Sequence, residues 1–174
     1  RVLFRSPDAV LDRFARKTTW KTPFWNNILF ADLTKLFAMQ GTDAGDAACM
    51  RIWKSCPGPE HRWRIEQAMC ALDPRRFQEP PSVFAPLSQG PWDRASDVQV
   101  RLGAILHDRG AILEAGRRAK NPHLYNAGRE EFIRTLGDVA DASAMNDLAS
   151  LLSPGEPDEV RSAALNALRS FQDE

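Results

Sequence analysis

Apolar positions in the last third of the chain recur at three- and four-residue steps, which is the pattern of an amphipathic helix. The segments GREEFIRTL (Gly128–Leu136) and VRSAALNAL (Val160–Leu168) show it most clearly, and they are offset by 32 positions. Self-similarity at a fixed period predicts a repeated structural unit rather than two unrelated helices. The aligned positions at this offset are Arg129 with Arg161, Phe132 with Ala164, Ile133 with Leu165, and Leu136 with Leu168.

Weaker copies of the same pattern precede these two. The segment HRWRIEQAMCAL ends on Leu72, which lies two such offsets before Leu136. The segments ILFADLTKLFAM and ASDVQVRLGAIL lie about one offset before it and one offset after it. The pattern therefore predicts helices that begin near residues 28, 61, 94, 126 and 158. Amphipathic segments that precede them predict antiparallel partner helices, and these lie at 7–17, 46–56, 110–120 and 141–152.

The stretch 74–91 breaks this pattern. It has prolines at positions 74, 80, 81, 86 and 91, and proline does not fit the interior of a helix. We expect an irregular segment here, with one short helix at Ser82–Leu87.

The segments EVRSAALNAL and GREEFIRTLGD, with the helix–turn–helix spacing between them, resemble the HEAT-repeat family in its compact bacterial form. The resemblance is close over 110–174 and weaker over 44–73. Elsewhere it depends only on helices that recur at the expected spacing. It implies an all-α fold, an α-solenoid of about five antiparallel helix pairs. It also implies that Arg129 and Arg161 join a polar ladder between repeats, so both are expected to be structural.

Composition adds limits on class and location. The 174 residues carry 23 basic and 23 acidic side chains, but the charge is unevenly distributed. Residues 1–76 carry 13 basic and 8 acidic side chains, whereas residues 130–174 carry 3 basic and 10 acidic ones. No apolar run approaches the roughly 18 residues of a membrane-spanning helix, so no membrane partner is expected. Three cysteines do not form a secreted disulfide framework, and we expect a cytoplasmic protein.

The first residues, RVLFRS, resemble the translation of a sequencing-library adapter. We therefore expect residues 1–6 to be an artefact and residues 7–174 to form one domain, a fragment of a longer chain.

Cys49, Cys56, His61 and Cys70 have the residue types of a zinc site. In an antiparallel hairpin that turns near Gly58, however, Cys49 and Cys70 lie about two helical turns, roughly 10 Å, from Cys56 and His61. One tetrahedral ion cannot bridge that separation. We expect no metal and three small apolar core cysteines.

An Arg/Trp cluster at 51–64 is the richest basic and aromatic group in the chain. It comprises Arg51, Trp53, Lys54, Arg62, Trp63 and Arg64. Such side chains can contact phosphates and stack on bases, and the resemblance extends to HEAT-like folds that are DNA glycosylases. Nucleic-acid binding through this cluster is therefore the alternative function, although nothing in the sequence marks a catalytic Asp.

The sequence holds no nucleophile elbow, zinc-protease motif, phosphate-binding loop or dinucleotide fingerprint, so no catalytic residue and no cofactor are expected. The favoured function is a non-catalytic module that binds a protein partner along its second helices. A third alternative is an accessory array that docks onto a lost upstream enzyme domain, with an apolar patch near 20–30. The residues expected on the partner-binding surface are Arg62, Trp63, Glu66, Arg94, Gln99, Glu130 and Arg134.

Overall fold

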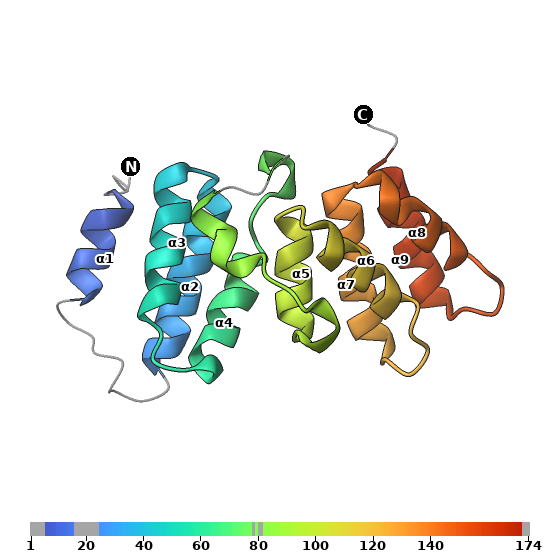
Figure 1. Cartoon of the computed structure of the whole chain (residues 1–174), viewed down its shortest axis with the longest axis horizontal. Coiled ribbons are helices and arrows are strands. Elements are labelled where there is room, and N and C mark those ends of the chain that lie inside the picture. Colours follow the sequence, from blue (N-terminus) through green and yellow to red (C-terminus); the bar gives the residue numbers. More distant parts are fainter. Residues whose placement is uncertain (1–5, 16–24, 78, 80–81, 172–174) are drawn as a thin grey trace. The chain divides into compact units, whose positions relative to one another are not determined.

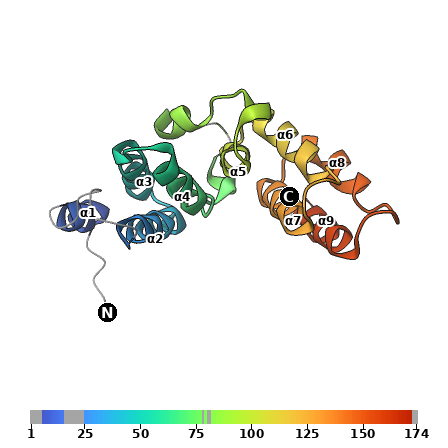
Figure 2. The ribbon, with the colours of Figure 1, turned by 90° about the horizontal axis from the view of Figure 1, so that it is seen from below.

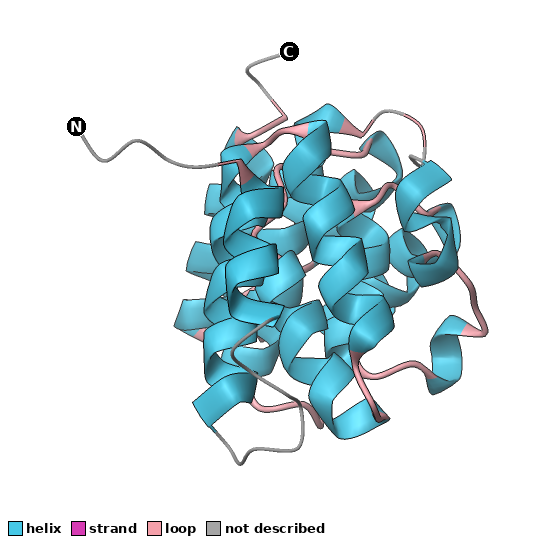
Figure 3. Ribbon diagram, turned by 90° about the vertical axis from the view of Figure 1, so that its left-hand side faces the viewer, coloured by secondary structure: helices cyan, strands magenta, loops and turns pink. Residues whose placement is uncertain are grey.

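The computed structural model describes residues 6–15, 25–77, 79 and 82–171. Over these residues the chain is helix and loop without a strand, which confirms the all-α class (Figures 1 and 3). None of the helices in these ranges has the length and apolar character needed to cross a membrane. Most of the expected artefact, residues 1–5, lies outside the described residues.

The chain divides into two compact units, residues 1–73 and 74–174. The expectation of one domain over 7–174 stays a prediction, because this division does not decide it. The first unit contains α1 (Pro7–Ala15), α2 (Trp25–Gln40), α3 (Asp43–Ser55) and α4 (Pro59–Met69). The second contains the 3₁₀ helices η1 (Pro74–Arg76), η2 (Ser82–Leu87), η3 (Trp92–Arg94) and η4 (Ala142–Ala144), and the α-helices α5 (Asp97–Ile105), α6 (Arg109–Ala119), α7 (Asn126–Val139), α8 (Met145–Ser150) and α9 (Asp158–Arg169).

The helix positions follow the sequence prediction closely. Helices expected near 28, 61, 94, 126 and 158 begin at residues 25, 59, 97, 126 and 158. The Pro-rich stretch forms η1 and η2, and η2 covers the expected Ser82–Leu87. The segment expected as one helix at 141–152 is instead η4 followed by the short helix α8.

In unit 1–73, α2 packs against both α3 and α4, and α1 packs against α3. Thr42 caps α3 by accepting a hydrogen bond from the Gly45 backbone N–H at 3.1 Å. Most of the buried side chains of this unit are apolar, and they include Phe37, Cys49, Met50, Ile52, Ile65 and Met69.

In unit 74–174, α7 packs between α5 and α9, while α6 contacts α5, α7 and α8. Figure 2 shows α6 and α8 on one side of this unit and α7 and α9 on the other. The core between them is formed by buried side chains from every one of these helices, among them Val100, Ile112, Phe132, Ile133, Leu136, Leu148 and Val160. Each pair of helices therefore buries a face that neither helix could bury alone.

Arg129 links three segments of this unit. Its side chain is only 2% exposed, its Nε donates to the Ala119 carbonyl at 2.8 Å, and its Nη2 contacts Glu156 at 2.6 Å. Arg161, at the equivalent position of α9, is more exposed and pairs with Asp158 of its own helix. Arg129 thus joins the end of α6 to the loop before α9, in keeping with the structural role expected for it.

Candidate functional site

A groove of about 620 Å³ runs between α7 and α9. Its α7 side is lined by Glu130, Arg134 and Asp138, which follow one another at four-residue steps along one face of the helix. Its α9 side is lined at the same steps by Ser162, Asn166 and Ser170, and each of these stands one repeat offset after its α7 counterpart. The groove is therefore lined by positions of α7 and α9 that the 32-residue sequence offset aligns.

Small residues form the base of the groove because the two helices approach closely there. A Cβ placed on Gly137 would lie 2.7 Å from Cα of Ala167, a separation that real side chains do not show. Ala163 and Ala167 of α9 complete the apolar part of the lining. The close contact holds the helices together, while the polar side chains above it leave the groove open.

The lining is predominantly acidic. Glu130, Asp138, Asp158 and Glu159 contribute carboxylates, and Arg134 is the one basic side chain among the lining residues. Asp158 and Glu159 stand in the first turn of α9, where the positive end of the helix dipole stabilises negative charge. Asp158 also pairs with Arg161, and the lining keeps an excess of negative charge that a positively charged group would complement.

The structure brings two of the expected surface residues together, and they are Glu130 and Arg134. Arg94 and Gln99 also belong to this unit but do not line the groove. Arg94 is exposed in η3. Gln99 has a structural task, because its Oε1 accepts from the Ser96 N–H at 3.1 Å while Ser96 Oγ accepts from the Gln99 N–H at 3.2 Å. This reciprocal pair is a capping box that starts α5.

The other three expected surface residues lie on α4 in unit 1–73. Trp63 is 46% exposed and Arg62 is exposed, so both are accessible. Glu66 is 5% exposed and accepts a hydrogen bond from Trp53 Nε1 at 3.0 Å. The expectation that Glu66 contributes to an exposed surface is corrected by this burial, since its carboxylate faces Trp53 and not solvent.

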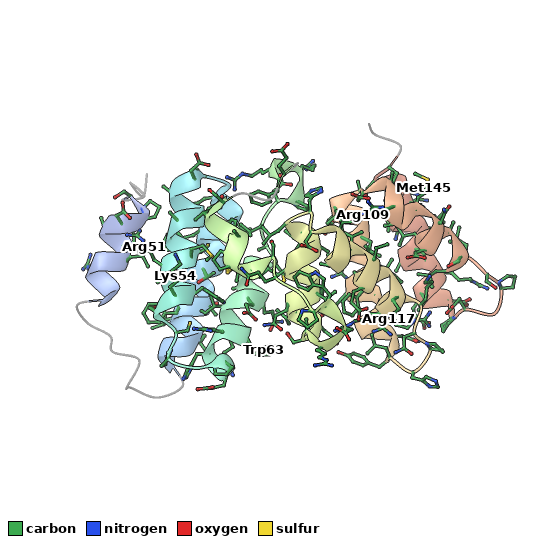
Figure 4. The ribbon with its side chains drawn as sticks, in the orientation of Figure 1. Arg51, Lys54, Trp63, Arg109, Arg117 and Met145 are labelled. Atoms are coloured by element: carbon green, nitrogen blue, oxygen red, sulfur yellow. The ribbon has the colours of Figure 1, made fainter. Side chains whose placement is uncertain are left out.

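The Arg/Trp cluster at 51–64 is largely used within the fold. The Arg62 guanidinium lies 4.7 Å from the ring centroid of Trp53, whose indole N–H is already bonded to Glu66. Arg51 pairs with Asp8 of α1. The members that stay accessible without such a contact are Lys54 and Trp63, which Figure 4 labels on α3 and α4.

Two of the three cysteines, Cys49 and Cys56, are core side chains, whereas Cys70 is only partly buried. Burial raises the pKa of Cys49 to about 12, with Asp46 adding to the effect, and burial likewise raises the pKa of Cys56 to about 11. Both thiols are buried and donate to backbone carbonyls, Cys49 to Thr34 at 3.5 Å and Cys56 to Ile52 at 3.4 Å. Among the described residues, no three His, Cys, Asp or Glu side chains are grouped so as to hold a metal ion.

Sequence reasoning missed most of the groove lining, including Asp138, Ser162, Asn166 and Ser170. The signal was present in the repeat itself. Moving from Glu130 and Arg134 by one repeat offset gives Ser162 and Asn166, the two side chains that face them across the groove.

A search of family models, of curated proteins and of solved structures found no match to this chain.

Proposed function

We propose that the chain is a HEAT-like α-solenoid that works as a non-catalytic protein-interaction module, and that it binds a partner segment in the groove between α7 and α9. The observation that supports this most is the use of equivalent positions, 130/134/138 and 162/166/170, to line one open groove. Repeat proteins commonly bind partners along surfaces formed by the same position of successive units.

The chemistry of the lining defines the partner. Four carboxylates line the groove with the Arg134 guanidinium, and Arg161 beside them pairs with Asp158. An excess of two negative charges remains, so an extended segment with Lys or Arg side chains complements it. Ser162, Asn166 and Ser170 can donate or accept hydrogen bonds to the backbone of such a segment. The small base of Gly137, Ala163 and Ala167 leaves room for it.

The test is fluorescence anisotropy with a labelled 12-residue peptide that alternates Lys or Arg with Ser, and with an analogue in which Gln replaces every Lys and Arg. We expect the basic peptide to bind and the Gln analogue to bind at least tenfold more weakly, which corresponds to about 1.4 kcal/mol. The double variant Ser162→Lys/Asn166→Lys fills the groove with positive charge and should abolish binding. The matched control is Asn146→Lys/Ser150→Lys, which places the same exchanges on exposed positions of α8. Equal loss in both variants would contradict the proposal.

The alternative functions have less support from the described residues. A nucleic-acid interface at 51–64 would have the accessible ring of Trp63 to stack on, whereas one face of Trp53 is covered by Arg62. Docking onto an upstream enzyme domain was linked to an apolar patch near 20–30. Trp20 lies outside the described residues, Phe30 is buried, and Leu29 is 42% exposed, so one apolar side chain of that stretch is accessible. A reducing, cytoplasmic setting is part of the proposal and accords with the three free thiols.

A further inference from the structure

A second exposed surface lies on α6 and α8, the helices on the other side of unit 74–174 from α7 and α9 (Figure 2). Leu113 is 52% exposed and Met145 is 42% exposed. The two residues stand one repeat offset apart, so successive repeats place a large apolar side chain at the same outward position. Helices α6 and α8 contact one another. This surface, defined by Arg109, Leu113, Arg117 and Met145, is called the α6–α8 patch.

Two arginines flank the apolar part of the patch. Arg109 and Arg117 stand one helical turn before and after Leu113 on α6, and Figure 4 shows both on the same face as Met145. Arg109 is exposed, and its charge acts on the nearby Asp141 carboxylate, whose pKa is lowered mainly by its hydrogen bond from the Ser143 side chain and further by Arg109. The Arg117 side chain is 63% exposed, although its Nε and Nη2 contact Glu114.

The carboxylates near the α6–α8 patch either have a hydrogen-bond or ion-pair partner or lie close to one of these arginines. The Glu114 side chain is buried and contacts both Arg117 and Arg118, and these contacts, that with Arg117 above all, lower its pKa. Asp141 accepts hydrogen bonds from Ser143, and Asp147 pairs with Lys120. Asp93 lies near Arg117 and adds to its electrostatic stabilisation. Both guanidinium groups are exposed beside Leu113, and each has a carboxylate near it, Asp141 for Arg109 and Glu114 for Arg117.

We propose that the α6–α8 patch binds a short acidic amphipathic helix of a partner protein. An apolar side chain of that helix packs on Leu113 and Met145, and Asp or Glu side chains one turn away pair with Arg109 and Arg117. Met and Arg are enriched in protein interfaces, and apolar anchors at helical spacing are the usual basis of helix recognition. This surface shares no residue with the α7–α9 groove and requires the opposite charge in its partner.

A protein partner fits better than a membrane surface. Binding to anionic lipid takes clusters of about four to eight basic residues next to the inserted side chains, and the patch offers two. It also lacks the Trp or Phe side chains that typically enter the interface of a bilayer.

The probe is a fluorescein-labelled 15-residue peptide with Leu at positions 4, 7, 8 and 11 and Glu predominating elsewhere, together with an analogue in which Gln replaces every Glu. We expect the Glu peptide to bind, with an affinity that falls as salt is raised, and the Gln peptide to bind at least tenfold more weakly. Methyl resonances of Leu113 and Met145 should shift on titration. The double variant Arg109→Gln/Arg117→Gln should weaken binding of the Glu peptide at least tenfold, while Glu114 keeps its contact with Arg118 in that variant.

Two controls separate this surface from the rest of the molecule. Leu113→Gln should weaken binding, whereas Leu165→Gln, at an exposed leucine of α9, should not. The groove variant Ser162→Lys/Asn166→Lys should bind the Glu peptide as the parent does, so failure of the groove proposal leaves this one intact. Equal binding of the Glu and Gln peptides would overturn the proposal. So would unchanged binding by Arg109→Gln/Arg117→Gln, or binding to phosphatidylserine vesicles without binding to the Glu peptide.

Discussion

Gly137 of α7 and Ala167 of α9 are in such close contact that a Cβ on the glycine would lie 2.7 Å from both Cα and Cβ of the alanine. The Ala167 Cα belongs to the backbone, so it cannot rotate away from a new Cβ as the end of a long side chain can. This contact sets the distance between the two helices and hence the width of the groove above it.

Gly137→Val should therefore destabilise the protein, because the added atoms must push α9 away from α7. Overpacking of this kind costs about 1–3 kcal/mol, and valine gains little helix propensity to offset it. Urea unfolding followed by circular dichroism measures the change. The control is Gly155→Val, where the nearest atom to a new Cβ is Ser153 Oγ at 4.0 Å. A loss of equal size in both variants would show that the helix contact is not the cause.

Arg129 and Arg161 occupy equivalent repeat positions but should differ in their contribution to stability. Arg129→Met removes a buried guanidinium that bonds the Ala119 carbonyl and Glu156, and we expect a loss of about 2 kcal/mol. Arg161→Met removes a pair whose Arg161 and Asp158 side chains are 37% and 84% exposed, and such a pair near solvent is worth less than about 1 kcal/mol. Thermal unfolding of the two variants tests this difference. Equal destabilisation would contradict the role inferred for Arg129.

The sequence was sufficient to locate the helices because their apolar spacing is local information. The repeat offset also relates the groove-lining residues to one another, because residues of α7 and α9 that are one offset apart line the groove. The sequence did not reveal which polar side chains are buried. Glu66 stands among polar residues of α4, and only its hydrogen bond from Trp53 of the preceding helix explains its burial.

Arg118 illustrates the same limit. In the sequence it belongs to the basic run GRRAK, which is typical of a solvated helix end. In the structure its guanidinium pairs with Glu114 and Asp97 and donates to the carbonyls of Trp92 and Ala95. Except for Glu114, these partners are distant in the sequence, and their approach depends on the path of the irregular segment before α5. No local pattern carries that information.

The hydrogen bond from Trp53 to Glu66 makes a prediction of its own. Glu66→Gln keeps an acceptor oxygen for the indole N–H, so it should change the free energy of unfolding by less than about 1 kcal/mol. Glu66→Leu leaves the indole N–H without its acceptor in a partly buried site, and we expect a loss of about 1–3 kcal/mol. Urea unfolding checks both variants. If Glu66→Gln and Glu66→Leu are equally stable, the hydrogen bond does not support the packing of α3 on α4.

The buried thiol of Cys49 predicts how stability depends on alkaline pH. Its pKa is raised to about 12 in the folded protein, mainly by burial, whereas an unfolded cysteine titrates near about 8.5. Between roughly pH 8.5 and 12 the unfolded state therefore binds fewer protons at this site, and stability falls as pH rises. The contribution of one such group is at most about 1.4 kcal/mol per pH unit.

Cys49→Ala removes the group. Between pH 9 and 10.5 its free energy of unfolding should fall less steeply with pH than that of the parent. Other groups titrate in this range in both proteins, so the difference between the two slopes is the measurement, and equal slopes would show that Cys49 ionises as readily in the folded chain as in the unfolded one.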